Sequence, residues 1–380
     1  MISVDRIIAK QLMNPFDLVQ RDFSLLAIFI LLLTSCNQEL TKTSAEDFKM
    51  SVEGTAQGTT YSVGYYDLQE RNLKPHIDSL LDRIDPSIST YKPGSVIDRW
   101  NSSEHGVKVD RLFMEVLIES WLVYSATDGA FDPTVKPLVS YWGFGPEKFE
   151  SHFEIDQMEI DRLSRLIGLD SLQIIRANDT IAFDEMANLE LMNDSIFLYK
   201  PNSEIQLDFN AIGQGWSVDK VASFLYALDI EVFFVEIGGE IVAGKPKPNG
   251  EIWRFGIDKP ENDSKDRELQ AIVNLRNRAV ATSGNYRKFY LKDGEKFSHT
   301  IDPKSGRPVQ HNLLSATVFS SSAAEADAMA TAFMVIGKDS TLSYLAENAA
   351  LGDYVYLIYD SLGTTQTYMS PQVEGLIEEQ

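Results

Sequence analysis

An aspartate and a threonine four residues apart, Asp327 and Thr331, offer the most direct chemistry in this sequence. Ser322 followed three positions later by Glu325 has the pattern of a capping box, which predicts that a helix begins here. On that helix Asp327 and Thr331 share a face. A carboxylate and a hydroxyl on one face supply two hard oxygen ligands for Mg²⁺ or Ca²⁺. The alternative is a solvent-facing aspartate beside a threonine that bonds back to a helix carbonyl.

A second polar stretch, residues 207–219, joins a strand pattern to a helix pattern. The strand pattern ends at Leu207, and Gly213 and Gly215 come just before the helix that we expect to begin at Trp216. Glycines at the start of a helix let backbone N–H groups approach a phosphate. Glycine pairs also serve simply to turn the chain, so this stretch alone leaves both interpretations open.

Two further stretches have the composition of pocket walls. Residues 129–145 are rich in aromatic and turn residues, which suits a pocket for a planar ring or a packed loop. Residues 281–288 and 298–303 concentrate hydroxyls, basic side chains and His299 in an otherwise acidic chain. Side chains could meet an anion there, although a histidine at a strand end also serves structural roles.

Composition excludes several classes of function. The net charge of −22 over 380 residues argues against nucleic acid as a partner, because binding it requires Lys and Arg to neutralise phosphates. The sequence lacks the GxGxxG, Walker A, HExxH, CxxC and GxSxG motifs. Its five histidines are scattered, so a histidine-based zinc site has little support. An anionic ligand would therefore need a metal ion or focused backbone donors.

The elements that position these residues mix strands and helices without strict alternation. Strand patterns occupy residues 59–65, 204–207, 231–237, 254–258, 270–275, 279–282 and 354–359. Helical periodicity occupies residues 75–84, 112–127, 160–167, 216–228 and 323–336, with Gly337 as a stop signal. This mixture predicts an α+β fold of antiparallel sheets covered by helices. The polar region 147–201 is interpreted as a variable insertion or peripheral subdomain.

The N-terminal region predicts export. Nine apolar residues, Leu25–Leu33, follow Lys10 and Arg21 and end just before the single cysteine, Cys36. A helix of nine residues spans about 14 Å, against roughly 30 Å of hydrocarbon, so a signal peptide over 1–35 fits better than a spanning helix. The small residues before Cys36 match a bacterial lipobox, which predicts lipidation of Cys36 and a polar tether over 36–49. The alternative is an ordinary secretory signal with an incidental cysteine.

Several motifs in one order give the chain a resemblance to the ApbE family of FAD:protein FMN transferases. The match runs from about Gly54 to Ile336, within a domain placed at 50–370. The motifs that carry it are Gln57–Tyr61, Ser89–Tyr91, Gly129–Val135, Leu207–Asp219, Val235–Glu240, Ala281–Lys288, Ser298–Pro303 and Glu325–Thr331.

The resemblance implies a T-fold-like, two-lobed single domain and a reaction. FMN passes from FAD to a Ser or Thr hydroxyl of an acceptor protein, forming a phosphoester and releasing AMP. The implied cofactor is Mg²⁺, with Ca²⁺ or Mn²⁺ as substitutes, and FAD is the substrate. The implied acceptors are subunits of Rnf complexes or of the sodium-pumping NADH:quinone reductase. A lipid anchor facing the periplasm would hold the enzyme on the acceptor's side of the membrane.

The resemblance also implies residue roles. The metal ligands would be the side chains of Asp327 and Thr331 and the main-chain carbonyl of Ala211. His299 would be the general base on the acceptor hydroxyl or would orient a phosphate. The implied FAD contacts are Gln57, Tyr91, Ala130, Phe131, Asp132, Gln214, Asp219, Ser283, Gly284 and Asn285. Two positions depart from the family pattern, since Gln57 stands where many members have Met and Gln214 where many have Lys.

Two other functions fit the same residues. A lipoprotein could bind FAD without transferring FMN, or a metal-dependent pyrophosphatase could use water in place of the acceptor hydroxyl. The pair Asp327 and Thr331 favours catalysis over storage, because a pure binder would not need to polarise a pyrophosphate. It does not separate transfer from hydrolysis.

Overall fold

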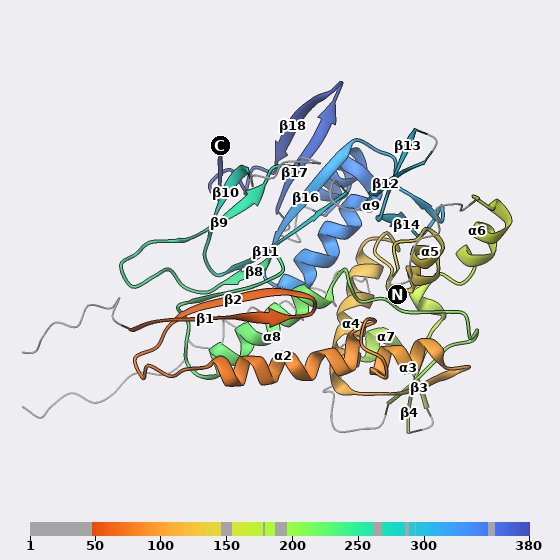
Figure 1. Ribbon diagram of the computed structural model, residues 1–380, viewed down its shortest axis with the longest axis horizontal. Coiled ribbons are helices and arrows are strands. Elements are labelled where there is room, and N and C mark those ends of the chain that lie inside the picture. The colour runs from red at the N-terminus through yellow and green to blue at the C-terminus, as the bar shows by residue number, and fades with distance from the viewer. Residues whose placement is uncertain are drawn as a thin grey trace, which may run out of the picture. The chain divides into compact units, whose positions relative to one another are not determined.

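Eight antiparallel strands form the main sheet, in the order β1-β2-β7-β8-β11-β16-β17-β18 (Figure 1). Each strand is rich in β-branched or aromatic residues, which suit a pleated surface that is buried on at least one face. The strands are β1 (Lys49–Ala56), β2 (Thr59–Tyr66), β7 (Phe233–Ile237), β8 (Glu240–Ala243), β11 (Arg278–Gly284), β16 (Leu313–Ser320), β17 (Tyr354–Ser361) and β18 (Thr364–Met369).

The computed structural model describes most of the compact unit Phe48–Gln380. The described residues are 48–145, 154–177, 179–186, 196–260, 268–285, 289–292, 294–348 and 354–380. The predicted signal peptide, Cys36 and nearly all of the predicted tether therefore lie outside them. Within those ranges, none of the helices has the length and apolar character that crossing a membrane requires.

The two faces of the main sheet face different layers, as period-two patterning requires. Ala279, Ala281 and Val318 belong to the large core on the helical face. Their neighbours Val280 and Phe319 belong to a second core on the opposite face. There a three-stranded antiparallel sheet covers them, made of β9 (Trp253–Asp258), β10 (Leu269–Leu275) and β19 (Ile377–Glu379).

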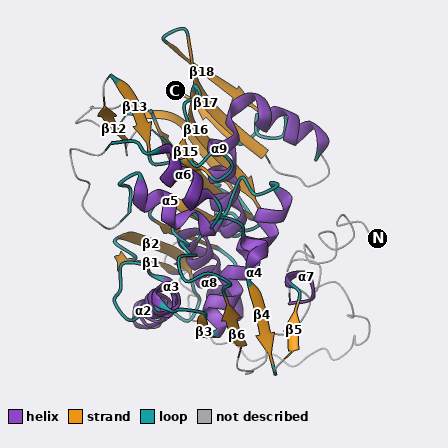
Figure 2. Cartoon of the chain, turned by 90° about the vertical axis from the view of Figure 1, so that its right-hand side faces the viewer, coloured by secondary structure: helices purple, strands orange, loops and turns teal. Residues whose placement is uncertain are grey.

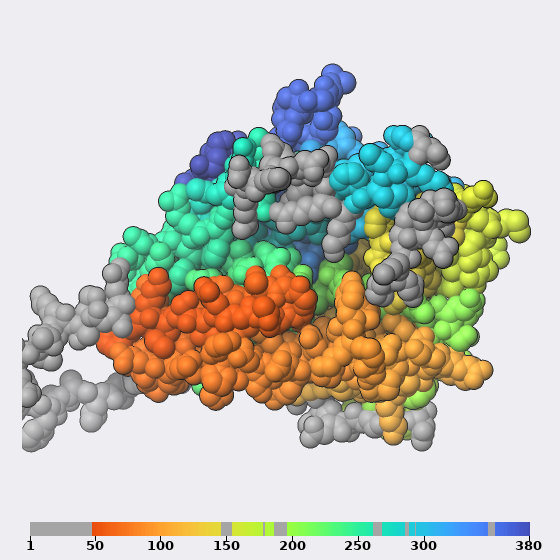
Figure 3. All heavy atoms as spheres, viewed as in Figure 1, coloured from red at the N-terminus to blue at the C-terminus, as the bar shows by residue number. Residues whose placement is uncertain are grey.

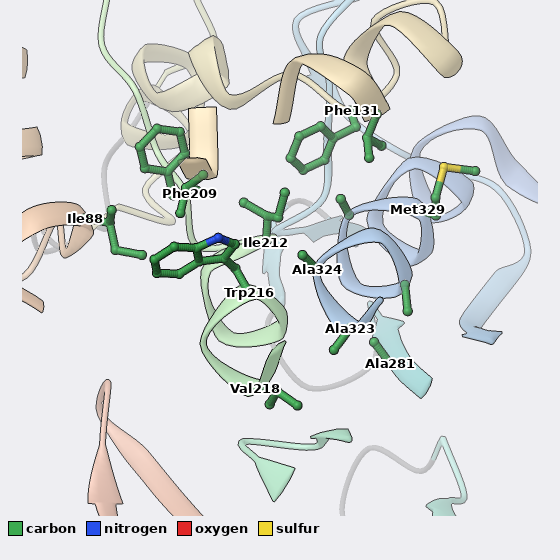
Figure 4. Close-up of a cluster of buried hydrophobic side chains, with 14 of the residues drawn as sticks. Ile88, Phe131, Phe209, Ile212, Trp216, Val218, Ala281, Ala323, Ala324 and Met329 are labelled. Carbon is green, nitrogen blue, oxygen red and sulfur yellow. The ribbon is translucent and has the colours of Figure 1, made fainter. Parts of the chain in front are cut away.

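Two long helices, α8 (Gly213–Ala227) and α9 (Ala323–Glu347), cover the helical face. Figure 4 shows them side by side, with Trp216 of α8 packed between Ile88 and Ile212. The helices approach closely at Gly215, where an added Cβ would lie against the Ala323 carbonyl and 2.9 Å from the Asp327 Cβ. A glycine is therefore required at this crossing.

Helix α9 begins where the sequence predicts and continues past the predicted stop at Gly337. Ser322 is its N-cap, and the Ser322 hydroxyl accepts a hydrogen bond from the Glu325 N–H at 3.2 Å. Gly337 has φ of 77°, which interrupts the helical backbone, and a second helical segment follows directly. The interruption leaves the Met334 carbonyl 2.8 Å from Nε2 of His311. The predicted stop at Gly337 is thus a break within a longer element.

Two more helices complete the layer beneath the sheet. They are α2 (Lys74–Ile88) and α4 (Arg111–Ala126), close to the predicted 75–84 and 112–127. Strands β1 and β2 lie along α2 on the face seen in Figure 3. Asp110 caps α4 by accepting a hydrogen bond from the Phe113 N–H at 2.9 Å. Burial of one α4 side chain such as Phe113 stabilises the fold by about 2–3 kcal/mol.

The region 147–201 contains more regular structure than its polar sequence indicates. Its described part forms α6 (Gln157–Ser164), β4 (Gln173–Arg176), β5 (Asp179–Ile181), α7 (Phe183–Met186) and β6 (Ile196–Tyr199). With β3 (Gly106–Val109) these strands make a four-stranded antiparallel sheet in the order β3-β6-β4-β5 (Figure 2).

The prediction of a strand at residues 204–207 is wrong. This segment has no ladder partner and is held by side chains. The Asn101 amide donates to the Leu207 carbonyl at 2.9 Å and accepts from the Leu207 N–H at 2.7 Å. The Lys200 ammonium donates to the carbonyls of Ser203 and Ile205, each at 2.9 Å. Alternation of apolar residues here reflects burial without a sheet.

The remaining elements are short. The helices are α3 (Val96–Ser102), η3 (Pro133–Val135), α5 (Lys136–Tyr141) and η4 (Leu169–Ser171). Two hairpins pair β12 (Phe289–Lys292) with β13 (Glu295–Ser298) and β14 (Ile301–Asp302) with β15 (Arg307–Pro308). The predicted α+β fold of antiparallel sheets covered by helices is confirmed.

Candidate active site

Two buried carboxyl groups, Asp327 of α9 and Glu240 at the start of β8, form the centre of the candidate site. Each residue is only 7% exposed. The Gly215 N–H donates to Oδ2 of Asp327 at 3.2 Å, a long hydrogen bond. Oε2 of Glu240 has no hydrogen-bond partner among the described residues. Burial raises the pKa of both carboxyl groups, and the negative charge of Asp327 raises the pKa of Glu240 further.

Thr331 lies one helical turn beyond Asp327 and contacts the edge of β11. Its hydroxyl is 3.0 Å from the Ser283 hydroxyl. The structure thus brings together a residue predicted to hold metal and a residue predicted to contact FAD. The neighbouring Thr282 is directed elsewhere, because its hydroxyl pairs with that of Thr317 at 2.8 Å.

Ala211 stands immediately before Ile212, the N-cap of α8. Next to it, the Asn210 side chain is hydrogen-bonded to the Tyr91 hydroxyl, and Tyr91 is 64% exposed. Asn210 is itself oriented by Asp208, whose carboxylate accepts from the Asn210 N–H at 2.8 Å. The predicted metal carbonyl and a predicted flavin contact therefore lie together at the start of α8.

Both glutamines that depart from the family pattern lie at the first turns of α8. Gln57, in the β1–β2 turn with φ of 53°, donates its amide to the Ser217 hydroxyl at 2.5 Å. Its Oε1 is buried and has no partner within the described part of the chain. The amide of Gln214 packs against Gly238, where an added Cβ would lie 2.8 Å from Nε2. Two turns of the sheet and the start of α8 converge here.

The predicted Ser283–Asn285 loop ends β11. Gly284 pairs with Ser315 of β16. Asn285 is buried, and its amide donates to the Leu313 carbonyl at 3.0 Å. Oδ1 of Asn285 has no hydrogen-bond partner in the described ranges. An acceptor oxygen buried without a donor is a candidate for ligand binding, because leaving it unpaired costs free energy.

The predicted loop Ala130-Phe131-Asp132 is buried. Asp132 accepts hydrogen bonds from the N–H of Thr134 at 2.8 Å and from its hydroxyl at 2.6 Å. Burial raises the pKa of Asp132 to about 6, and the hydrogen bonds from Thr134 oppose that shift. The loop is tied to the metal segment, because the Asp208 N–H donates to the Pro133 carbonyl at 2.8 Å.

Asp219 lies two turns into α8, where it supports the start of α9. Its carboxylate accepts hydrogen bonds from the N–H groups of Ala323 and Ala324, both at 2.9 Å, and from the Ser322 hydroxyl at 2.7 Å. Burial raises the pKa of Asp219, and these bonds act against the shift. Asp219, which is predicted to contact FAD, therefore caps the start of α9, and both of its carboxylate oxygens accept hydrogen bonds.

His299 is half-buried between β13 and β14. Its ring meets the edge of Phe144 at a centroid distance of 6.4 Å, and Phe144 stacks on Tyr290 at 5.3 Å. Phe144, which belongs to the predicted pocket wall, thus lies against the predicted base, and Tyr290 extends this aromatic surface. They favour a planar ligand nearby.

Glu240 belongs to the site, but the sequence alone indicated no role for it. It lies in the quoted motif Val235–Glu240, but a lone carboxylate after two glycines gives no spacing signal. Only the strand register places it beside α9. No cluster of three or more His, Cys, Asp or Glu that could hold a metal occurs among the described residues. A cation here would depend on hydroxyl and carbonyl oxygens as well as carboxylates.

Comparison with known proteins identifies the class. The ApbE family model matches residues 57–354. The FAD:protein FMN transferase of Vibrio cholerae serotype O1 is 33% identical over 325 residues, covering 84% of this chain and 89% of the relative. That of Escherichia coli K12 is 31% identical over 354 residues, covering 91% and 95%.

Solved structures agree with these matches. The flavin transferase ApbE from Vibrio cholerae superposes with a TM-score of 0.71 at 30% identity, covering 86% of this chain and 99% of that one. The apo flavinyl transferase ApbE from Pseudomonas stutzeri gives 0.71 at 29% identity, covering 86% and 96%. The fold and these matches define an enzyme of the transferase class. The chain belongs to the ApbE family.

Proposed function

We propose that this chain transfers FMN from FAD to a Ser or Thr hydroxyl of an acceptor protein, forming a phosphoester and releasing AMP. The observation that carries the proposal is the buried pair Asp327 and Glu240, which lies beside Thr331 in a member of this family. Two buried carboxyl groups without a basic partner among the described residues are suited to a cation. A cation is what a pyrophosphate substrate requires in a chain of net charge −22.

The donor set fits Mg²⁺. Asp327 supplies a carboxylate, Thr331 a hydroxyl and Ala211 a main-chain carbonyl, all hard oxygen donors. Ca²⁺ and Mn²⁺ accept the same donors. When bound, the ion would neutralise charge on the pyrophosphate and so assist departure of AMP.

Residues of the chain itself can accept the proton and bind the substrate. The acceptor oxygen attacks the phosphorus on the FMN side, the bond to the AMP oxygen breaks, and the hydroxyl proton passes to His299 as general base. Phe144 and Tyr290 place aromatic surface beside that histidine. Gln57 and Asn285 each present a buried oxygen that can accept a hydrogen bond from FAD.

The N-terminal sequence supports a location for the reaction. We propose that the chain is exported and lipidated at Cys36, so that it faces the periplasm from a bacterial membrane. Flavoprotein subunits of the Rnf or NADH:quinone reductase type are acceptors of suitable location. A shared membrane surface raises the effective concentration of enzyme and acceptor.

The test incubates the chain with FAD, Mg²⁺ and such an acceptor subunit, followed by mass spectrometry of the acceptor and chromatography of free nucleotides. We expect acceptor carrying FMN on a Ser or Thr, together with AMP. Free FMN and AMP beside an unmodified acceptor would instead identify a pyrophosphatase. Bound FAD without any product would identify a storage protein.

A further inference from the structure

Glu240 has an environment that the proposed reaction leaves unexplained. It is the first residue of β8 and only 7% exposed, although charged side chains are rarely buried without a partner. One carboxylate oxygen accepts a hydrogen bond from its own backbone N–H, and Oε2 has no partner in the part of the chain that is described. Leaving a buried acceptor unpaired costs free energy.

The nearest charge makes that cost larger. Asp327 is the main charged neighbour of Glu240, and Glu236 is the other. All three groups are acidic. No Lys or Arg is ion-paired or hydrogen-bonded to Glu240 or Asp327 among the described residues. Like charges facing each other in a buried site repel, and either a proton held between them or a bound cation relieves that repulsion.

The backbone holds Glu240 in place firmly. Glu240 pairs with Ile237 across the β7–β8 turn, and the turn uses Gly238 and Gly239, with φ of 67° and 116°. The Gly239 N–H donates to the Glu236 carboxylate at 2.8 Å, which fixes the turn from the other side. Strand β8 in turn contacts both α8 and α9. The backbone of Glu240 is therefore fixed by the main sheet next to α8 and α9.

We propose that Glu240 is a second carboxylate of the cation site, acting with Asp327 to hold the divalent ion. The inference rests on the metal site of the proposed function and adds a residue to it. Oε2 of Glu240, which has no donor among the residues that the structure describes, is the oxygen available to the ion or to its bound water. Thr331, Ala211 and Asp327 alone supply one negative charge, and Glu240 supplies the second.

The test measures binding of Mn²⁺ to the full chain by electron paramagnetic resonance, without FAD or acceptor. Glu240→Gln keeps the shape of the side chain and removes its charge. We expect its affinity for Mn²⁺ to fall about 10-fold or more, the range found for residues that support metal ligands. Glu240→Asp, which keeps the charge on a shorter chain, should retain more affinity than Glu240→Gln.

The matched control is Glu325→Gln on the same helix as Asp327. Glu325 is also a shielded carboxylate, but it accepts a hydrogen bond from the Ser320 hydroxyl. Its replacement should change Mn²⁺ affinity by less than about 2-fold. Thermal unfolding without metal provides a second readout. There Glu240→Gln should be at least as stable as the wild type, because it removes a buried like-charge contact.

The outcomes separate the two claims. Loss of affinity in Glu240→Gln, with Glu325→Gln unchanged, supports the inference. Wild-type affinity in a folded Glu240→Gln, with loss in Asp327→Asn, overturns it and leaves the proposed function standing. Equal affinity in wild type and Asp327→Asn overturns the metal site itself, and the inference fails with it.

Discussion

Two aspartates on the α8–α9 helix pair, the half-buried Asp219 and the buried Asp327, have opposite environments. Asp219 accepts three hydrogen bonds from the first residues of α9, and each of its oxygens is used. Asp327 lies on α9, about one turn beyond the residues that Asp219 contacts. It accepts a single long hydrogen bond from the Gly215 N–H and has Glu240 as its acidic neighbour. One carboxylate is stabilised by the fold itself, while the other has a single long hydrogen bond and an acidic neighbour.

The difference shows how to separate structure from chemistry in an acidic chain. A buried charge that is completely hydrogen-bonded is explained by its own neighbours. A buried carboxyl group that has few donors and lies next to another acidic group is a candidate for binding a proton or a cation.

The largest effect is expected for Asp327→Asn. The amide keeps the hydrogen bond from Gly215 and removes the charge that would hold the cation. FMN transfer should fall by at least about 100-fold, equivalent to about 3 kcal/mol. Rates of FMN-acceptor formation at saturating Mg²⁺ measure this. Retention of full Mg²⁺-dependent activity, in this variant or in Asp327→Ala, would refute the proposed metal site.

Gly215→Ala tests the crossing that brings the two helices together. The added methyl would press on the Ala323 backbone, which cannot move aside, so we expect a loss of about 3 kcal/mol in unfolding free energy. Gly213→Ala is the matched control. Its Cβ would lie 3.4 Å from the flexible end of Ile88 and should change stability by less than about 1 kcal/mol. Urea denaturation measures the unfolding free energy of both variants. Equal values for Gly215→Ala and Gly213→Ala would mean that the helices are not closely packed at Gly215.

Asp219→Asn should act on stability. The amide provides one acceptor oxygen in place of two, so part of the cap on α9 is lost, at a cost of about 2 kcal/mol. The KM for FAD of the folded variant should stay within about 2-fold of the wild type. A large rise in this KM at unchanged stability would favour the flavin contact that the family resemblance predicts for Asp219.

A smaller effect concerns pH. Burial, followed by the charges of Asp219 and Glu325, raises the pKa of Glu119 on α4 from 4.5 to about 7. The folded state therefore binds this proton more tightly than the unfolded state. Stability from this group is complete below about pH 4.5 and is lost as pH rises through about 7. Glu119→Gln should flatten that decline and be more stable at pH 8, by on the order of 1 kcal/mol.

Thermal unfolding from pH 5 to pH 8 measures this dependence. Glu104→Gln, at an exposed position before β3, is the control for loss of one charge. An unchanged pH profile in Glu119→Gln would mean that Glu119 is not shielded from solvent in the folded protein.

Local pattern predicted most of the framework and part of the site. The long helices and the strands β2, β7, β9, β10, β11 and β17 follow from periodicity, because each buries one face on a neighbour. Residues 204–207 show the limit, since side chains of Asn101 and Lys200 replace a strand partner that alternation cannot reveal. Glu240 shows it again, because strand pairing, which is non-local, determines its position beside Asp327.

The most direct test of the account titrates Mg²⁺ into metal-free wild-type chain with FAD and an acceptor subunit. The measured quantity is FMN bound covalently to the acceptor, determined by mass spectrometry. The account predicts no FMN-linked acceptor in EDTA. Adding Mg²⁺ should restore its formation in the wild type up to a saturating level, and Asp327→Asn should not recover. Equal amounts of FMN-linked acceptor with EDTA and with Mg²⁺ would contradict it.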